Sequence, residues 1–363
     1  MFLPTAVAAG VAALSLALWL RLSPSSVPLV DASVLLAFDD KALRTLHRAA
    51  GALGVLRLSG QHGLDADAAL GAAASLFALP LEAKRNASIV RGGFQRGYIP
   101  MGGEAGLATN LELKEGFCYG YPWDDAVPAP DALTGANAWP APLDASSRDR
   151  MLALHANASA LALRLAAAFS AALGLDGDPL GALCEGGDVV SMMRVFHYFA
   201  SNIAPGLAPG VPRIGSSPHT DWHFLTLIVQ DRGGLQVQAR DGRWVDVPAR
   251  AGEAVLIVGD YASALSEGAF RSPVHRVLLP PAGEERTSFT FFFYARFDAK
   301  IPPAAARAAA RRVEAENAAR PPSAPAYNTL VKSAEAALAL AERPFGELML
   351  DKWRGVAANA AQS

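Results

Sequence analysis

The part of the chain that most constrains its fold begins near residue 189, where short apolar runs alternate with Gly and Pro. These runs suit β-strands, because they are rich in β-branched and aromatic residues and are bounded by turn residues. They cover residues 189–199, 224–230, 234–238, 243–248, 254–260, 274–280 and 287–297. Short strands at this spacing predict an all-β barrel or jelly roll.

Helical patterns lie on both sides of this β segment. Apolar residues recur with helical spacing, and two short strand patterns stand among the earlier helices. The expected helices cover residues 41–53, 65–77, 148–173, 304–317 and 333–343, and the two strands cover residues 27–31 and 54–60. We expect a mainly β fold with flanking helices and an N-terminal helical layer, in which the helices wrap one β core.

Composition excludes several classes of protein. With 363 residues, of which 52% are hydrophobic, the chain can bury a substantial core and is not a disordered protein. Its formal net charge is -2 and it has no large basic block, so we expect no nucleic-acid partner. The two cysteines, Cys118 and Cys184, form no Cys-x-x-Cys motif, which excludes a structural zinc site of that kind. Only their even number would support a disulfide.

The first residues form a separate apolar segment. No residue from 2 to 20 is charged, and nineteen helical residues span about 28 Å, close to the thickness of a membrane core. We expect a membrane anchor with a cytosolic catalytic domain, because Arg21 follows the segment. A cleaved signal or transit segment and a buried helix are the alternatives. The sequons at Asn86 and Asn157 would suit a secretory or organellar location after cleavage.

Three residues form a candidate metal site. His219 and Asp221 are two residues apart, so at the end of a strand their side chains point to the same face. His275 follows Asp221 by 54 residues, enough for several antiparallel strands to intervene. Two histidines and one carboxylate leave three positions of an octahedral metal open, which suits an iron(II) oxygenase. A His-x-Asp motif alone often occurs by chance, so the order of the surrounding motifs matters.

A second group of residues could bind a dicarboxylic co-substrate. On a strand, Arg286 and Ser288 share one face, and together they offer a guanidinium and a hydroxyl to a carboxylate. Tyr198 lies on the strand before His219 and could donate another hydrogen bond. Two glutamates precede Arg286, and the alternative is that this arginine lies on the surface.

In order and spacing, these motifs resemble the isopenicillin N synthase-like family of iron(II)/2-oxoglutarate-dependent dioxygenases. The resemblance rests on residues 219–293, which include a Gly-Gly-Leu-Gln-Val turn and strand and the Gly259-Asp260 pair. It extends over about residues 27–300 through the runs FQRGYIPMGGE and ELKEGFCYG. It implies a distorted double-stranded β-helix, or jelly roll. We divide the chain into an apolar segment with its tether (1–26), a helix-rich oxygenase region (27–188), the jelly-roll core (189–300) and C-terminal helices (301–363).

The resemblance also assigns roles. It implies that His219, Asp221 and His275 bind iron and act in catalysis. It implies that Arg286, Ser288 and Tyr198 bind 2-oxoglutarate.

Two positions depart from the family pattern. Phe196 stands where many members have Asn, so one polar contact to the co-substrate would be missing. His223 stands where many have Gly. It could support the metal site or shape the substrate pocket, but we expect that it faces away as a local variation.

The implied reaction couples oxidation of a substrate C–H bond to conversion of 2-oxoglutarate and O2 into succinate and CO2. Fe(II) and 2-oxoglutarate are the expected cofactors, and ascorbate can be needed to keep the iron reduced. We expect hydroxylation or desaturation of a small organic metabolite, with residues 2–20 as a membrane contact. The candidate pocket residues are Phe94, Tyr98, Phe117, Phe292 and Tyr294. The alternatives are an iron oxidase of the same fold that does not use 2-oxoglutarate, a non-catalytic binding barrel and, last, a zinc hydrolase.

Overall fold

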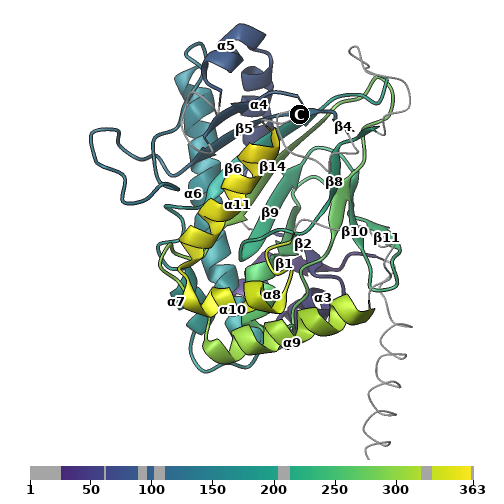
Figure 1. Cartoon of the computed structure of the whole chain (residues 1–363). Coiled ribbons are helices and arrows are strands. Elements are labelled where there is room, and N and C mark those ends of the chain that lie inside the picture. Colours follow the sequence, from purple (N-terminus) through teal and green to yellow (C-terminus); the bar gives the residue numbers. More distant parts are fainter. Residues whose placement is uncertain are drawn as a thin grey trace, which may run out of the picture.

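The computed structural model of the chain describes residues 26–60, 63–88, 96–101, 111–202, 213–319 and 329–360. Its strands form two main sheets, and its helices surround them (Figure 1). The apolar segment 2–20 and Phe94 lie outside the described residues. The membrane contact and the cellular location therefore stay predictions, as does the division of the chain into four parts.

The larger sheet has eight strands in the order β1-β2-β12-β9-β14-β6-β5-β3. All its neighbouring strands are antiparallel except β1 and β2. The strands are β1 (Leu29–Asp31), β2 (Val55–Ser59), β3 (Gly97–Ile99), β5 (Lys114–Gly120), β6 (Met192–Tyr198), β9 (Leu225–Gln230), β12 (Ala254–Val258) and β14 (Arg286–Phe293). Every residue of β9 and β12 is buried, which explains why their sequences are nearly continuous apolar runs.

The smaller sheet has the order β11-β10-β13-β8 and is antiparallel throughout. Its strands are β8 (Ser216–His219), β10 (Leu235–Gln238), β11 (Trp244–Asp246) and β13 (His275–Val277). One apolar cluster joins the two sheets, since Ile228 and Val255 of the larger sheet pack with Val237 and Val277 of the smaller one. A short parallel pair, β4 (Leu111–Glu112) with β7 (Arg213–Ile214), completes the strands. The predicted jelly roll is therefore confirmed.

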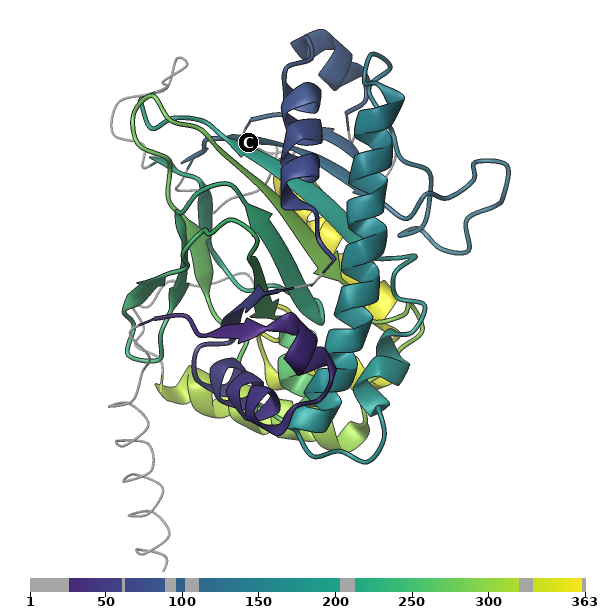
Figure 2. The same cartoon turned by 180° about the vertical axis from the view of Figure 1, so that it is seen from behind.

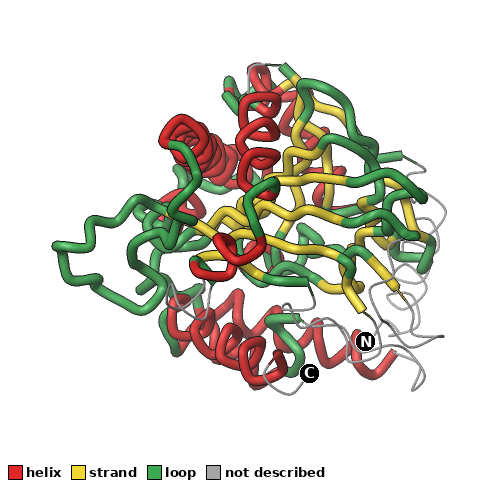
Figure 3. The backbone as a smooth tube through the Cα atoms, turned by 90° about the horizontal axis from the view of Figure 1, so that it is seen from above, coloured by secondary structure: helices red, strands yellow, loops and turns green. Residues whose placement is uncertain are grey.

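Helices cover the outer face of the larger sheet. Figure 2 shows α4 and the long α6 crossing this face, and Figure 3 shows helices on two sides of the strands. The helices are α2 (Ala32–Leu36), α3 (Asp40–Ala52), α4 (Ala66–Phe77), α5 (Leu81–Asn86), α6 (Ala145–Ala172), α7 (Pro179–Cys184), α8 (Asp260–Leu265), α9 (Pro303–Ala319), α10 (Ala334–Glu342) and α11 (Phe345–Ala360). The expected helical layer is thus present.

The longest helix, α6, begins where the side chain of Asp144 accepts a hydrogen bond from the amide of Ser147. Among the described residues it alone is long and apolar enough to cross a membrane. Half of its most apolar window is buried inside the protein, where Leu161 and Phe169 belong to the core. The helix is therefore a half-buried core helix, whose apolar character comes from packing against the sheet.

Several elements, β3, β5 and α11 among them, were not predicted from the sequence. The strand β3 forms in a glycine-rich stretch of the sequence and pairs with β5. The strand β5 and the C-terminal helix α11 were also missed. The two cysteines are free and buried, so the described structure contains no disulfide between them.

Gly259 allows two segments close to the candidate metal site to approach each other. A Cβ atom added at this residue would lie 1.8 Å from the carbonyl oxygen of His223. Backbone atoms cannot move aside as a flexible side chain can. We therefore predict that Gly259→Ala lowers the free energy of unfolding by about 1–3 kcal/mol, measured by urea denaturation.

Gly71 provides the matched control for this substitution. It lies inside α4, and an added Cβ would contact nothing within 4 Å. Gly71→Ala should raise the free energy of unfolding by about 0.5–1 kcal/mol, because Ala favours the helix. Equal effects of the two substitutions would contradict the steric account of Gly259.

Candidate metal and co-substrate site

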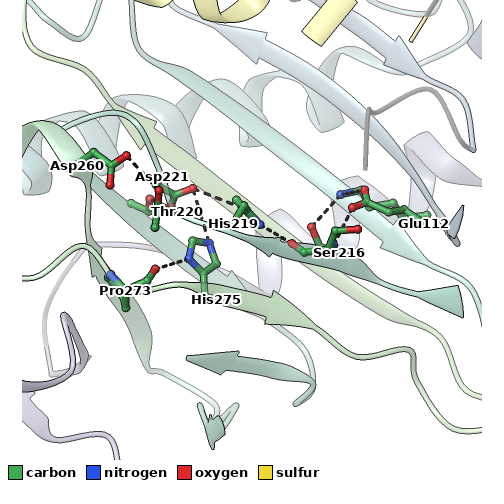
Figure 4. Close-up of polar contacts among 11 residues, drawn as sticks. Glu112, Ser216, His219, Thr220, Asp221, Asp260, Pro273 and His275 are labelled. Atoms are coloured by element: carbon green, nitrogen blue, oxygen red, sulfur yellow. Dashed lines mark hydrogen bonds and ion pairs between the residues drawn. The ribbon is translucent and has the colours of Figure 1, made fainter. Parts of the chain in front are cut away.

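The register of two strands brings the candidate metal ligands together. His275 of β13 is the direct cross-strand partner of His219 of β8, and their ring centroids lie 4.3 Å apart. Asp221 follows two residues after His219, and its Oδ1 lies 3.8 Å from His219 Nε2 and 3.6 Å from His275 Nε2. One ligand atom from each residue can be chosen so that all three lie within 4.8 Å of one another (Figure 4). The three side chains could hold one metal ion.

Backbone carbonyl groups orient both imidazoles. His219 Nδ1 lies 2.7 Å from the carbonyl oxygen of Ser217, and His275 Nδ1 lies 3.2 Å from that of Pro273. These hydrogen bonds place the proton of a neutral ring on Nδ1. They leave Nε2 of each ring as the lone-pair donor toward the space beside Asp221.

The segment that carries Asp221 is held at several points. The hydroxyl of Thr226 donates a hydrogen bond to Asp221 Oδ2, which leaves Oδ1 on the side of the histidines. The Asp221 carbonyl oxygen accepts from the amide of Asp260 at 2.7 Å. The Asp260 carboxylate in turn accepts from the Thr220 hydroxyl at 3.0 Å and from the Leu330 amide at 2.7 Å. These hydrogen bonds position the carboxylate of Asp221 before any ion binds.

The electrostatic surroundings favour metal-binding protonation states. Burial by itself raises the pKa of Asp221, but nearby His275, His223 and His219 and the Thr226 hydroxyl bring it below its usual value. Burial lowers the pKa of His275 to about 4. At neutral pH the site therefore offers a carboxylate and a neutral imidazole, the forms that bind divalent cations.

Arg286 lies in the interior rather than on the surface. Its side chain is 1% exposed, and its guanidinium lies 4.7 Å from the ring centroid of Tyr198. It donates hydrogen bonds to the Ser288 hydroxyl, the Gln230 side-chain oxygen and the Arg232 carbonyl oxygen. All three acceptors are neutral, and no carboxylate of the described residues lies within ion-pair distance.

The alternative that Arg286 is a surface residue is wrong, because its side chain is buried, and both preceding glutamates have other partners. Glu284 pairs with Arg232, and Glu285 pairs with His197 at 2.9 Å. The two exposed glutamates just before β14 thus turn away, and Arg286, the first residue of the strand, points inward. A buried guanidinium without a counter-ion is costly, so this position suits an anionic ligand.

Phe196 contributes an aromatic face where a polar side chain was expected from related sequences. Its ring lies 6.0 Å from that of Tyr198, and the ammonium of Lys114 lies 4.6 Å from its centroid. Gly116 is its cross-strand partner, and a Cβ there would come within 3.2 Å of the ring. The departure at residue 196 is therefore accommodated by a glycine opposite it.

His223 is buried and points inward, so the expectation that it faces away is wrong. Its ring lies 4.8 Å from Phe292 and 5.7 Å from Tyr294, and its Nδ1 makes no hydrogen bond among the described residues. Phe292 is the cross-strand partner of Thr226, whose hydroxyl contacts Asp221. The ring of His223 therefore lies beside the metal site.

Two other candidate pocket residues, Tyr98 and Phe117, lie on the face of the larger sheet opposite to the one that carries Arg286 and Phe292. Tyr98 donates a hydrogen bond to Glu115 at 2.6 Å, and Phe117 stacks on Trp139 at 5.2 Å. Tyr98 and Phe117 belong to the core beneath the helices. Of the aromatic candidates that the structure describes, only Phe292 and Tyr294 contact His223 beside the metal ligands.

Sequence comparison gives the same picture as the geometry. Residues 190–295 match the 2OG-Fe(II) oxygenase superfamily, and residues 27–142 match the N-terminal domain described as "non-haem dioxygenase in morphine synthesis". The chain is 32% identical over 274 residues to the 2-oxoglutarate-dependent dioxygenase citB of Monascus ruber. That match covers 72% of this chain and 81% of the relative. It is also 32% identical over 293 residues to gibberellin 3-beta-dioxygenase 1 of Oryza sativa subsp. japonica, with coverage of 77% and 70%.

Solved structures have the same fold. A putative 2OG-Fe(II) oxygenase from Caulobacter crescentus superposes with a TM-score of 0.64 at 26% identity, covering 92% of this chain and 100% of that one. A protein of Neurospora crassa, solved in complex with alpha-KG and thymine, also gives a TM-score of 0.64. At 22% identity, with coverage of 87% and 96%, it shows the fold alone.

The hydroxyl of Thr226 gives a direct test of the site geometry. Thr226→Val keeps the shape of the side chain but removes the hydrogen bond to Asp221. We predict that the affinity for Co(II), used as an iron(II) substitute, falls by about 10-fold, as for other partners of metal ligands. Thr287→Val on β14 is the control, because the side chain of Thr287 lies on the opposite face of the strand from those of Arg286 and Ser288 and should leave Co(II) binding unchanged. Equal Co(II) affinity in both variants would contradict the role of Thr226.

Proposed function

This chain belongs to the 2OG-Fe(II) oxygenase superfamily and is a 2-oxoglutarate-dependent dioxygenase, and we propose that it hydroxylates or desaturates a small organic metabolite. Its cofactors are Fe(II) and 2-oxoglutarate, as for the family. O2 is the second co-substrate.

We assign the iron to His219, Asp221 and His275. The convergence of two Nε2 atoms and one carboxylate oxygen supports this assignment. Side chains on one face leave the remaining positions of the ion open for the co-substrate and O2. A structural zinc site would instead be closed by four protein ligands, and only three donors converge here among the described residues.

The observation that carries the function is the buried, uncompensated Arg286. We assign it, with Ser288 and Tyr198, to the distal carboxylate of 2-oxoglutarate, whose other end would reach the metal. A guanidinium surrounded by neutral acceptors gains an ionic partner when this dicarboxylate binds. A hydrolase would leave Arg286 without a role, and a non-catalytic barrel would have no use for the metal ligands.

When bound, iron and 2-oxoglutarate supply the oxidation. 2-Oxoglutarate and O2 would become succinate and CO2, and the second oxygen atom would enter the substrate as a hydroxyl group or leave as water with two hydrogens taken from the substrate. The protein's own residues orient and shield this chemistry. Asp221 and His275 are buried, and Phe292 and Tyr294 present apolar surface beside them, which keeps bulk water out.

The same surroundings support the class of substrate. His223, Phe292 and Tyr294 form an aromatic wall with one polar atom, Nδ1, that makes no internal hydrogen bond among the described residues. The rice relative is named for a gibberellin, which is a small organic molecule. The aromatic wall suits a molecule of that kind with an apolar face.

Succinate formation tests the function. Protein loaded with iron under anaerobic conditions should release succinate from 2-oxoglutarate when O2 and a substrate from a metabolite library are added. His275→Ala should abolish this release, because it removes a metal ligand. Succinate release that persists unchanged without His275, or that does not depend on 2-oxoglutarate, would contradict the proposal.

Arg286 gives a prediction for the co-substrate alone. In Arg286→Ala, the binding of 2-oxoglutarate to the Mn(II)-loaded protein should weaken by about 2–5 kcal/mol, measured by calorimetry. Arg232→Ala is the control, since Arg232 contacts Arg286 only through its backbone carbonyl. Near-normal 2-oxoglutarate affinity in Arg286→Ala would overturn the assignment.

A further inference from the structure

We infer that Glu112, held by Lys114, is a positioning residue for the metal ligand His219. The inference rests on the proposed assignment of His219 to the iron. It concerns a buried ion pair outside the metal ligands, and it explains how the least enclosed ligand is kept in place.

His219 needs more support than the other two ligands. Its side chain is 33% exposed, whereas those of His275 and Asp221 are 6% and 5% exposed. Packing therefore fixes His219 less than its neighbours. Its orientation depends on the hydrogen bond from Nδ1 to the carbonyl oxygen of Ser217, 2.7 Å away. The position of the Ser217 peptide thus decides where Nε2 points.

Ser217 lies in an edge strand. In the smaller sheet β8 pairs with β13 on one side only, and the pairing between them is irregular near Ser216. The backbone groups on the free edge of β8 need partners from elsewhere. Pro218, the next residue, has no amide hydrogen and cannot help to pair this edge.

Glu112 supplies the missing partner at this edge. Its Oε1 accepts a hydrogen bond from the amide of Ser217 at 2.7 Å. Its Oε2 lies 3.0 Å from the ammonium of Lys114, which also lies 3.3 Å from the Ser216 hydroxyl. The Lys114 and Glu112 side chains are 6% and 7% exposed, so the pair is held in a dry environment. Figure 4 shows Glu112 on the far side of Ser216 from His219.

The location of Glu112 ties the two sheets together. Glu112 ends β4, which pairs with β7, and β7 leads directly into β8. Lys114 begins β5, which belongs to the larger sheet, and the amide of Leu113 between them donates to the Ile214 carbonyl oxygen at 3.0 Å. Residues 112–114 therefore fix β8, the strand that carries His219, relative to the larger sheet.

A second ion pair nearby provides a matched control. Lys84 and Glu115 are 2.8 Å apart and are 7% and 5% exposed, much like the first pair. Glu115 is the neighbour of Lys114 in β5 but turns to the opposite side, where it contacts Tyr98 and His197. The partners of this pair lie on β3 and β6 rather than on β8, so its loss should affect stability without affecting the metal.

The experiment replaces each ion pair by apolar residues in the full chain. Glu112→Leu with Lys114→Met is compared with Glu115→Leu with Lys84→Met, since a complete replacement leaves no unpaired buried charge. The probe is Co(II), titrated into metal-free protein and followed by its visible absorption, which also reports the number and geometry of ligands. The first variant should bind Co(II) about 10- to 100-fold more weakly, with an altered spectrum. The control should match the parent.

Glu112→Gln keeps the size of the side chain and decides the question if the double variant does not fold. It retains an oxygen for the Ser217 amide but loses the charge that holds Lys114, so Co(II) binding should weaken by less than in the double variant. Parent-like Co(II) affinity and spectrum in every Glu112 variant that folds, or an equal loss in the control, would overturn the inference. A parent chain whose Co(II) binding does not need His219, tested with His219→Ala, would overturn the proposed metal assignment itself.

Discussion

The antiparallel register of β8 and β13 is the constraint on which the site depends. Because His219 and His275 are direct cross-strand partners, their rings meet at 4.3 Å without any long-range adjustment of the chain. A shift of one residue in either strand would turn one imidazole to the opposite face of the sheet. The rest of the roll, including the apolar core between the sheets, serves to keep this register in place.

Buried charge gives the interior its chemical character. One part of the interior holds the carboxylate of Asp221 beside the neutral imidazole of His275, and another holds the uncompensated guanidinium of Arg286. The first arrangement attracts a cation and the second an anion. A dicarboxylate that contacts both a cation bound at Asp221 and the guanidinium of Arg286 therefore offsets the free-energy cost of burying each charge. Other ionic groups near the site, such as Glu112 and Lys114, are already paired within the protein.

Much of the fold and the site could be predicted from the sequence, because both depend on local patterns. Short apolar runs that are rich in β-branched and aromatic residues and bounded by Gly and Pro indicate strands, and His-x-Asp at a strand end places two ligands on one face. Supporting residues were missed, because Thr226 and Glu112 become partners of the ligands only when distant strands pair. The inward orientation of His223 likewise depends on contacts with β14. The strand β3 was missed because glycine-rich sequence around it resembles a loop, and its partner β5 supplies the pairing.

Diffraction at the absorption edge of the metal, from crystals grown anaerobically with Fe(II) and 2-oxoglutarate, would locate the iron and its ligands. We predict one iron peak bounded by Nε2 of His219, Nε2 of His275 and Oδ1 of Asp221, with a carboxylate of 2-oxoglutarate against the guanidinium of Arg286. An iron peak away from these three atoms, or a 2-oxoglutarate molecule that leaves Arg286 without an anionic partner, would contradict it.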